Sequence, residues 1–154
     1  MFQLLIASIV VVADQITKYL MTSILLQRPG HTIPLVDGVL HFTYAENKGA
    51  AFSILQNQRW LFISLTVVVC AVIVYAVFAR PNMSLMLKIS LGLILGGAVG
   101  NLIDRIRLGY VVDFIDFRII NYPIFNVADS AVVIGTILFG YYVIFVSDAK
   151  KSMV

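Results

Sequence analysis

Asp113 and Asp129 are the side chains whose type and surroundings best suit acid–base chemistry in this sequence. Asp113 stands within a run of β-branched and aromatic residues, where we expect little access to water, and desolvation raises the pKa of a carboxyl. If the two carboxyls approach to about 4 Å, their repulsion at an effective dielectric near 20 is roughly 4 kcal/mol, or about three pKa units. One carboxyl then holds a proton while the other stays charged, and such a pair can drive a water into an amide without a metal. Asp104 and Asp116 remain alternative members of the pair.

Asp14 and Lys18 are charged residues inside the first apolar stretch. An ionisable side chain at membrane depth costs about 2.5 to 3.5 kcal/mol on insertion scales, so each one suggests a function. Their spacing of four residues places them on one face of a helix, where they can pair. A structural ion pair and a role in a site both explain this spacing.

Asn101, Asp104 and Arg105 follow one another at helical spacing and share a face with Gly97. A basic end of a helix can simply anchor it at the membrane interface, and we interpret Arg107 in this way. An inward polar face beside glycine is better suited to holding a site, which is our interpretation of Asn101 and Asp104.

Asn126 and Asp129 are three residues apart, at the start of the last apolar stretch. This spacing predicts a helix that begins with Asn126 as N-cap and Asp129 at the third position, where both side chains occupy free amide groups. The positive end of the helix dipole then stabilises the charge of Asp129. Capping and catalysis are compatible roles for this acid.

The elements that position these residues are membrane-spanning helices. The 154 residues are 60% hydrophobic and 12% charged, with a mean hydropathy of +0.96, which is too apolar for a soluble domain. A hydrocarbon core of about 30 Å needs roughly 20 helical residues. Four stretches are long enough, namely 2–26, 60–79, 85–103 and 127–146, and we expect one domain over 1–154. In the third stretch, Gly92, Gly96 and Gly100 predict a close approach of another helix.

An even number of spans puts both termini on one side of the membrane and the loops 27–59 and 104–126 on the other. Basic residues are denser in the short link at 80–82 and in the tail at 150–151 than in the long loops, which favours cytoplasmic termini. Both long loops contain strand patterns. Residues 40–44 and 52–55 predict a small hairpin, and 110–117 predict an extended run before a turn at 121–123.

Several function classes are excluded or disfavoured by composition. The net charge of +3 is scattered rather than clustered, so we expect no nucleic-acid partner. Cys70 lies in an apolar run and is interpreted as packing. The first apolar stretch lacks a basic leader and contains Asp14 and Lys18, so we expect a retained helix and not a cleaved signal.

Five ordered blocks resemble the signatures of the bacterial lipoprotein signal peptidase family, also called signal peptidase II. They are ADQITK at 13–18, ENKGAAF at 46–52, GNLIDR at 100–105, VVDF at 111–114 and FNVAD at 125–129. The resemblance implies an all-α membrane protein with four transmembrane helices and a small extracytoplasmic β-cradle. It implies an aspartic endopeptidase of the bacterial cytoplasmic (inner) membrane, with the active site near the extracytoplasmic face.

By that resemblance, the substrates are diacylglyceryl-modified prolipoproteins, cut on the amino side of the lipidated lipobox cysteine within membrane lipid. The resemblance also implies inhibition by globomycin and no cofactor or metal. The catalytic pair falls on Asp113 and Asp129. The residues that support the site or contact the substrate fall on Asp14, Lys18, Asn47, Gly97, Asn101, Asp104, Arg105 and Asn126.

Three alternatives come from other classes. A small transporter or channel could use intramembrane acids as an ion path, but most acids of this sequence cluster on one side. A serine or cysteine protease is disfavoured, because there is no Gly-x-Ser-Gly element and Cys70 has no neighbouring base. A metal site using His31 and His41 would need a long loop to bring them to a carboxylate.

Overall fold

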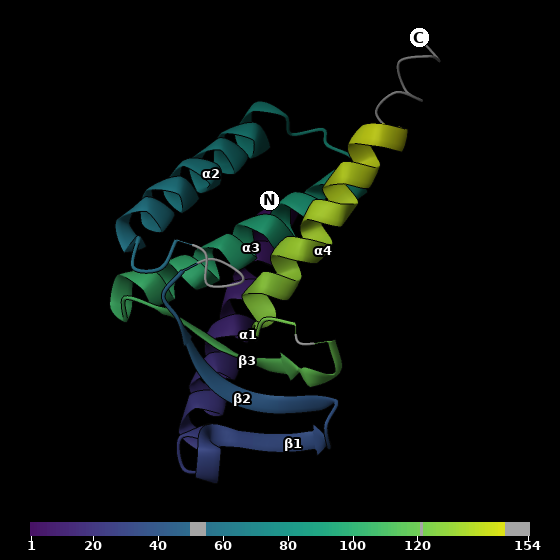
Figure 1. The fold of residues 1–154 in the computed structure, drawn as a ribbon. Helices are drawn as coiled ribbons and strands as arrows, with labels where there is room; N and C mark the ends of the chain where they lie inside the picture. The colour runs from purple at the N-terminus through teal and green to yellow at the C-terminus, as the bar shows by residue number, and fades with distance from the viewer. Residues whose placement is uncertain (50–54, 121, 147–154) are drawn as a thin grey trace.

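The computed structural model describes residues 1–49, 55–120 and 122–146, and consists of a helix bundle with a small sheet at one end (Figure 1). The four helices are α1 (Phe2–Leu25), α2 (Arg59–Ala79), α3 (Leu85–Arg107) and α4 (Val127–Tyr141), and α4 continues as the π-helical turn η4 (Tyr142–Val146). All four are long and apolar enough to cross a membrane, in agreement with the prediction of four transmembrane helices. The strands are β1 (Thr32–Val36), β2 (Leu40–Asn47) and β3 (Val111–Phe117), with short 3-10 turns η1 (Pro29–His31) and η3 (Arg118–Ile120).

Helix α3 lies between its neighbours, and its glycines allow close packing on two sides (Figure 1). A Cβ at Gly92 would stand 2.7 Å from the Gln3 carbonyl oxygen, and one at Gly96 would stand 2.8 Å from that of Ala7, both on α1. The predicted close approach at these small residues is therefore confirmed. Much of the apolar surface of α2 is exposed, as expected for helices whose partner is lipid.

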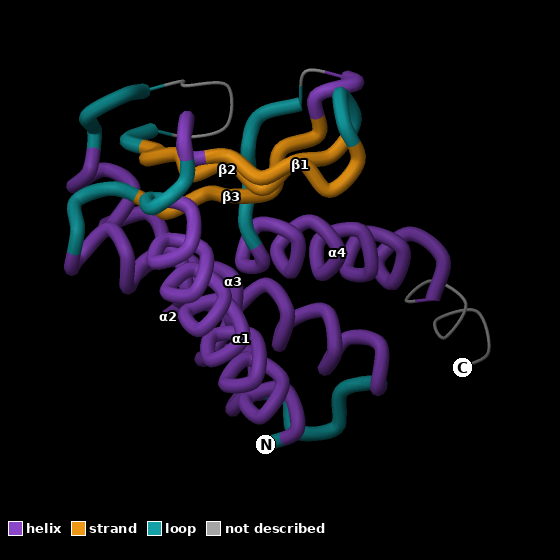
Figure 2. The backbone as a smooth tube through the Cα atoms, turned by 90° about the horizontal axis from the view of Figure 1, so that it is seen from below, coloured by secondary structure: helices purple, strands orange, loops and turns teal. Residues whose placement is uncertain are grey.

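The sheet is antiparallel in the order β1-β2-β3 and lies across one end of the helices (Figure 2). Strands β1 and β2 come from the loop after α1, and β3 comes from the loop after α3. The pairing of β2 with β3 places these parts of the two long loops at the same end of the helix bundle. The sheet thereby ties β3, which carries Asp113, to the rest of the molecule.

Strand β2 forms a hairpin with β1, a pairing that the sequence did not predict. Strand β2 pairs with β1, which precedes it, through a turn at 37–39 that uses Gly38 with a φ of +69°. Of the expected partner 52–55, residues 52–54 lie outside the described residues and Leu55 lies in a turn. Asn121 of the predicted turn and the basic tail at 150–151 also lie outside the described residues.

The third helix is four residues longer than the stretch at 85–103 predicted, ending at Arg107. The extension places Asp104 and Arg105 within the last turns of α3 and not in the following loop. The difference has a physical reason, because polar residues lower the hydropathy of a stretch without breaking a helix whose backbone bonds continue. Asp104 therefore has a rigid helical position.

Candidate active site

The side chain of Asn126 holds Asp113 and Asp129 together at the junction of β3 and α4. Its Nδ2 donates to Asp113 Oδ1 over 2.6 Å, and its Oδ1 accepts from the backbone amide of Asp129 over 2.8 Å. Asp129 Oδ2 in turn accepts from the Asn126 backbone amide at 3.3 Å, which completes the predicted capping box. The two acids that sequence reasoning paired therefore share one neighbour.

Strand β3 reaches this junction because the segment before α4 pairs with it. Ile115 and Phe125 exchange backbone hydrogen bonds, with Ile115 N to Phe125 O at 2.8 Å and Phe125 N to Ile115 O at 3.1 Å. This bridge places the N-cap of α4 beside Asp113. Without it, the loop between β3 and α4 would leave the separation of the two acids undefined.

Both carboxylates accept hydrogen bonds from neutral amides. Asp113 Oδ2 accepts from Asn47 Nδ2 at 3.0 Å, and Asp129 Oδ1 accepts from Asn101 Nδ2 at 2.7 Å. Asp113 is 2% exposed. Its burial, and next the negative charge of Asp129, raise the pKa of Asp113 to about 7, against the lowering effect of the two amides.

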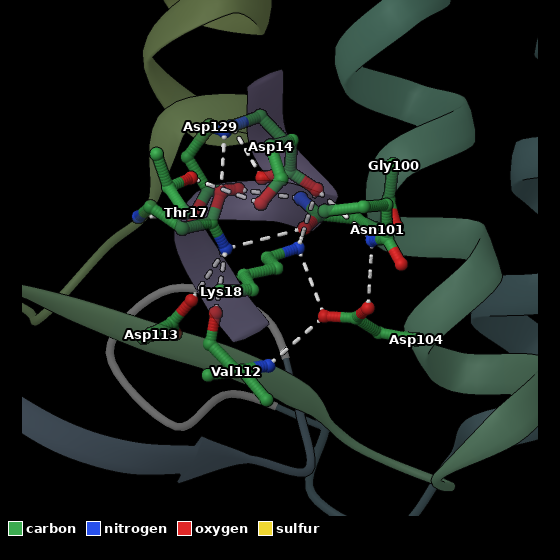
Figure 3. Close-up of polar contacts among 12 residues, drawn as sticks. Asp14, Thr17, Lys18, Gly100, Asn101, Asp104, Val112, Asp113 and Asp129 are labelled. Atoms are coloured by element: carbon green, nitrogen blue, oxygen red, sulfur yellow. Dashed lines mark hydrogen bonds and ion pairs between the residues drawn. The ribbon is translucent and has the colours of Figure 1, made fainter. Parts of the chain in front are cut away.

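Lys18 binds the other two buried acids of the bundle (Figure 3). Its Nζ lies 2.9 Å from Asp14 Oδ2, 2.9 Å from Asp104 Oδ2 and 2.9 Å from Asn101 Oδ1, and its side chain is 4% exposed. The predicted pairing of Asp14 with Lys18 is confirmed, and Asp104 is a further partner from α3. Buried charges of this kind are tolerated because they are paired and hydrogen-bonded.

Asp14 also holds the first turn of α4. Its Oδ1 accepts from the backbone amide of Ala128 at 3.0 Å, so α1 supplies a second cap to the helix that carries Asp129. Gln15 was not singled out in the sequence, yet its Nε2 donates to Asp14 Oδ2, the Gly100 carbonyl and Asp104 Oδ1 at 3.2, 3.3 and 3.0 Å. The feature of the sequence that could have indicated this role is the position of Gln15 directly beside Asp14.

The alternative acids Asp104 and Asp116 have different surroundings. Besides Lys18, Asp104 Oδ2 accepts from the Val112 backbone amide at 3.1 Å, which links α3 to β3. Asp116 Oδ2 accepts from Thr43 at 2.7 Å and Arg118 Nε at 2.8 Å. Although burial raises the pKa of Asp116, these bonds and the charge of Arg118 hold it below its usual value. Each acid is thus bonded to a cation, in contrast to Asp113 and Asp129.

Gly97 allows α3 and α4 to meet at the site. A Cβ there would collide with the Ala128 carbonyl oxygen and would stand 2.7 Å from a methyl of Val132. The predicted inward face of α3 is therefore confirmed, with Asn101 and Asp104 both buried on it. Glycine at this position lets α3 and α4 approach closely beside the bond between Asn101 and Asp129.

A cavity of about 370 Å³ opens beside Asp129. Its lining includes the polar side chains of Asn47, Asn101, Arg105 and Asp129, the hydroxyl-bearing residues Thr66 and Tyr122, and apolar residues such as Phe62. Arg105 is fixed by a bond to the Gly49 carbonyl at 3.2 Å and by the ring of Phe62, 4.9 Å from its guanidinium carbon. The cavity therefore combines polar groups near Asp129 with apolar walls.

The histidines contact other groups. His41 Nε2 lies 4.0 Å from Asp37 Oδ1, and His31 Nδ1 lies 3.4 Å from the Leu25 carbonyl oxygen. Within the described ranges, no three His, Cys, Asp or Glu residues gather in a way that could hold a metal ion. The metal interpretation therefore has no geometric support in this part of the chain.

A bundle of membrane-length helices with a cavity and a buried polar cluster defines a class, the multi-pass membrane enzymes, and two solved structures agree. Both are described as bacterial membrane enzymes determined in meso, at 2.3 and 1.9 Å resolution. The first has a TM-score of 0.84 and 34% identity, covering 97% of this chain and 90% of the other. The second has a TM-score of 0.81 and 35% identity, with 94% of each chain covered.

The family follows from sequence comparison. The model of the family described as Signal peptidase (SPase) II matches residues 6–145. A lipoprotein signal peptidase of Caldanaerobacter subterraneus subsp. tengcongensis is 50% identical, covering 92% of this chain and 95% of the relative. One of Clostridioides difficile is 41% identical, covering 98% and 100%. The chain belongs to the signal peptidase II family, a family of proteases.

Proposed function

We propose that this protein removes signal peptides from diacylglyceryl-modified prolipoproteins, cutting on the amino side of the lipidated cysteine, with Asp113 and Asp129 as the catalytic pair. Family membership supports the reaction. One observation carries the choice of residues. Within the described part of the chain, the hydrogen bonds to Asp113 and Asp129 come from amides, whereas Asp14 and Asp104 are bonded to Lys18. Acids free of a bonded cation can exchange protons during a reaction.

The proposed cycle uses one shared proton. Asp113 carries it at rest, in keeping with its raised pKa, and Asp129 is ionised. Asp129 takes a proton from water while the water oxygen bonds to the scissile carbonyl carbon, and Asp113 gives its proton to the carbonyl oxygen. When the tetrahedral intermediate collapses, Asp129 protonates the leaving amine and Asp113 recovers the proton from the hydroxyl. Both carboxyls thus return to their starting states.

The other polar residues position this pair in the proposal. Asn126, Asn47 and Asn101 hold the carboxylates by their amides. Lys18, Asp14 and Asp104 brace α1, α3 and β3 around them. Arg105 lines the cavity, and its charge interacts with those of Asp129 and Asp113, so we assign it to substrate contact.

We further propose that the protein resides in the bacterial cytoplasmic membrane, with cytoplasmic termini and its sheet at the extracytoplasmic face. The paired long loops and the basic link after α2 support this orientation. A site at the end of the bundle keeps the lipidated residue at membrane depth while the scissile bond meets water. Globomycin, an inhibitor expected from the family resemblance, should occupy the same site.

A cleavage assay tests the proposal. The purified protein in detergent should cut a lipobox peptide that carries diacylglyceryl on its cysteine, with a chelator present, and should leave the unlipidated peptide intact. Globomycin should suppress the reaction. Failure to cut the lipidated peptide would refute the proposed function, and chelator-sensitive cutting would refute the metal-free mechanism.

A further inference from the structure

A second cavity, of about 400 Å³, lies on another side of the first turns of α4. It shares four lining residues with the first cavity, and these are Tyr122, Phe125, Asp129 and Val133. The remaining lining comes from the end of β3, from η3 and from α4. Two cavities therefore meet at Asp129.

The two cavities differ in chemistry. The first presents Asn47, Asn101 and Arg105 beside Asp129. Of the described residues that line the second, Asp129 alone is charged, and its neighbour Ser130 already donates to the Asn126 carbonyl at 3.0 Å. The second cavity is thus suited to hydrocarbon, and the first to a peptide with polar groups.

Exposed apolar side chains border the second cavity. Ile134 on α4 is 52% exposed, and Ile120 on η3 is 67% exposed. Helix α4 is long and apolar enough to span the membrane, and an exposed apolar side of such a helix is suited to contact with the acyl chains of a bilayer. A hydrocarbon chain can therefore enter the cavity sideways from the membrane without crossing water.

We propose that the second cavity binds the acyl chains of the substrate's diacylglyceryl group, while the first holds the peptide. This inference rests on the proposed function. The glyceryl thioether is attached to the cysteine directly after the scissile bond. The lipid therefore begins only one side-chain length away from the bond that is cut, close to the carboxylates. Phe117, Phe125 and Ile134 then form the apolar wall that contacts the acyl chains.

Substrates of different acyl length test this assignment. Ile134→Trp narrows the second cavity, and Thr66→Trp narrows the first, which Thr66 lines. We expect Ile134→Trp to lower kcat/KM by about tenfold for a dipalmitoylglyceryl peptide and to change it little for a dioctanoylglyceryl peptide. Thr66→Trp should lower both equally. Val72→Trp, at a 61% exposed position of α2 outside the described cavities, should change neither.

Ile134→Ala is the second variant, because it removes apolar contact without adding bulk. It should lower kcat/KM for the long-chain substrate by a few fold and again spare the short-chain one. Equal effects of both Ile134 variants on the two substrates, or none, would overturn the acyl-chain assignment. Failure of the proposed function is distinguishable, because the unaltered protein would then cut neither substrate.

Discussion

The Asn126 side-chain amide donates to Asp113 Oδ1 over 2.6 Å, although Asn126 is the N-cap of α4 and Asp113 lies in β3. The same amide group also bonds to Asn101 Oδ1 and the Val112 carbonyl, both at 3.2 Å. Asn126 is fully buried. One residue thus performs a local role, capping α4, and a tertiary role, joining β3 and α3 to it.

Substitutions at Asn126 should separate these two roles. Serine keeps an oxygen that can cap the helix but has no amide to reach Asp113, and alanine lacks both. We expect Asn126→Ser to be more stable than Asn126→Ala by about 1 kcal/mol, while both lose about tenfold or more in kcat. Thermal unfolding in detergent and the cleavage assay measure the two effects. Wild-type turnover in Asn126→Ser would contradict the tertiary role.

Removing either catalytic carboxylate should abolish the acid–base chemistry. Asp113→Asn and Asp129→Asn preserve shape but cannot exchange the proton, so we expect kcat to fall by about 10²- to 10⁴-fold in each. Asp116→Asn is the matched control, because Asp116 is bonded to Thr43 and Arg118. It should retain activity. Comparable losses in all three variants would favour a structural effect and contradict the assignment.

The pH dependence should follow Asp113. Its pKa of about 7 means that the shared proton is present below that pH and lost above it, so kcat/KM should fall as the pH rises through about 7. Because the folded pKa lies above the usual value of 3.8, the associated stability is complete below 3.8 and is lost as the pH rises through about 7. The Tm should therefore decline over this window. In Asp113→Asn, the Tm should decline less over this pH range. The same decline in the variant and the unaltered protein would contradict a raised pKa of Asp113.

Close packing at Gly97 should be indispensable. Gly97→Ala places a methyl group against the Ala128 backbone, which must move α4 and Asp129 away from Asn101. We expect a loss of about 1–3 kcal/mol in stability and a marked loss of turnover. A Cβ at Gly140 of α4 would meet no described heavy atom within 4 Å, so Gly140→Ala should be neutral or stabilise by about 0.5–1 kcal/mol. Equal behaviour of the two alanine variants in unfolding and cleavage assays would contradict this role of Gly97.

Local patterns were sufficient for much of the architecture. Each predicted span depends on the hydropathy of contiguous residues, and helices long and apolar enough to cross a membrane occupy the four predicted stretches with small shifts at their ends. The Asp14–Lys18 pair and the capping box of Asn126 with Asp129 involve residues three or four apart, which helical geometry alone brings together. Such features depend only on residues within about one helical turn of each other.

Contacts between segments that are far apart in the sequence could not be predicted from such local patterns. The sequence by itself determined the spans, the helix start at Asn126 and a set of candidate acids, in which Asp104 and Asp116 remained alternatives to the favoured pair of Asp113 and Asp129. Only the tertiary structure decided that β2 pairs with β1 and β3, and that Lys18 of α1 bonds Asp104 of α3 while Asp113 receives amides. The physical reason is that strand pairing and buried ion pairs depend on how helices cross, which packing over the whole bundle determines.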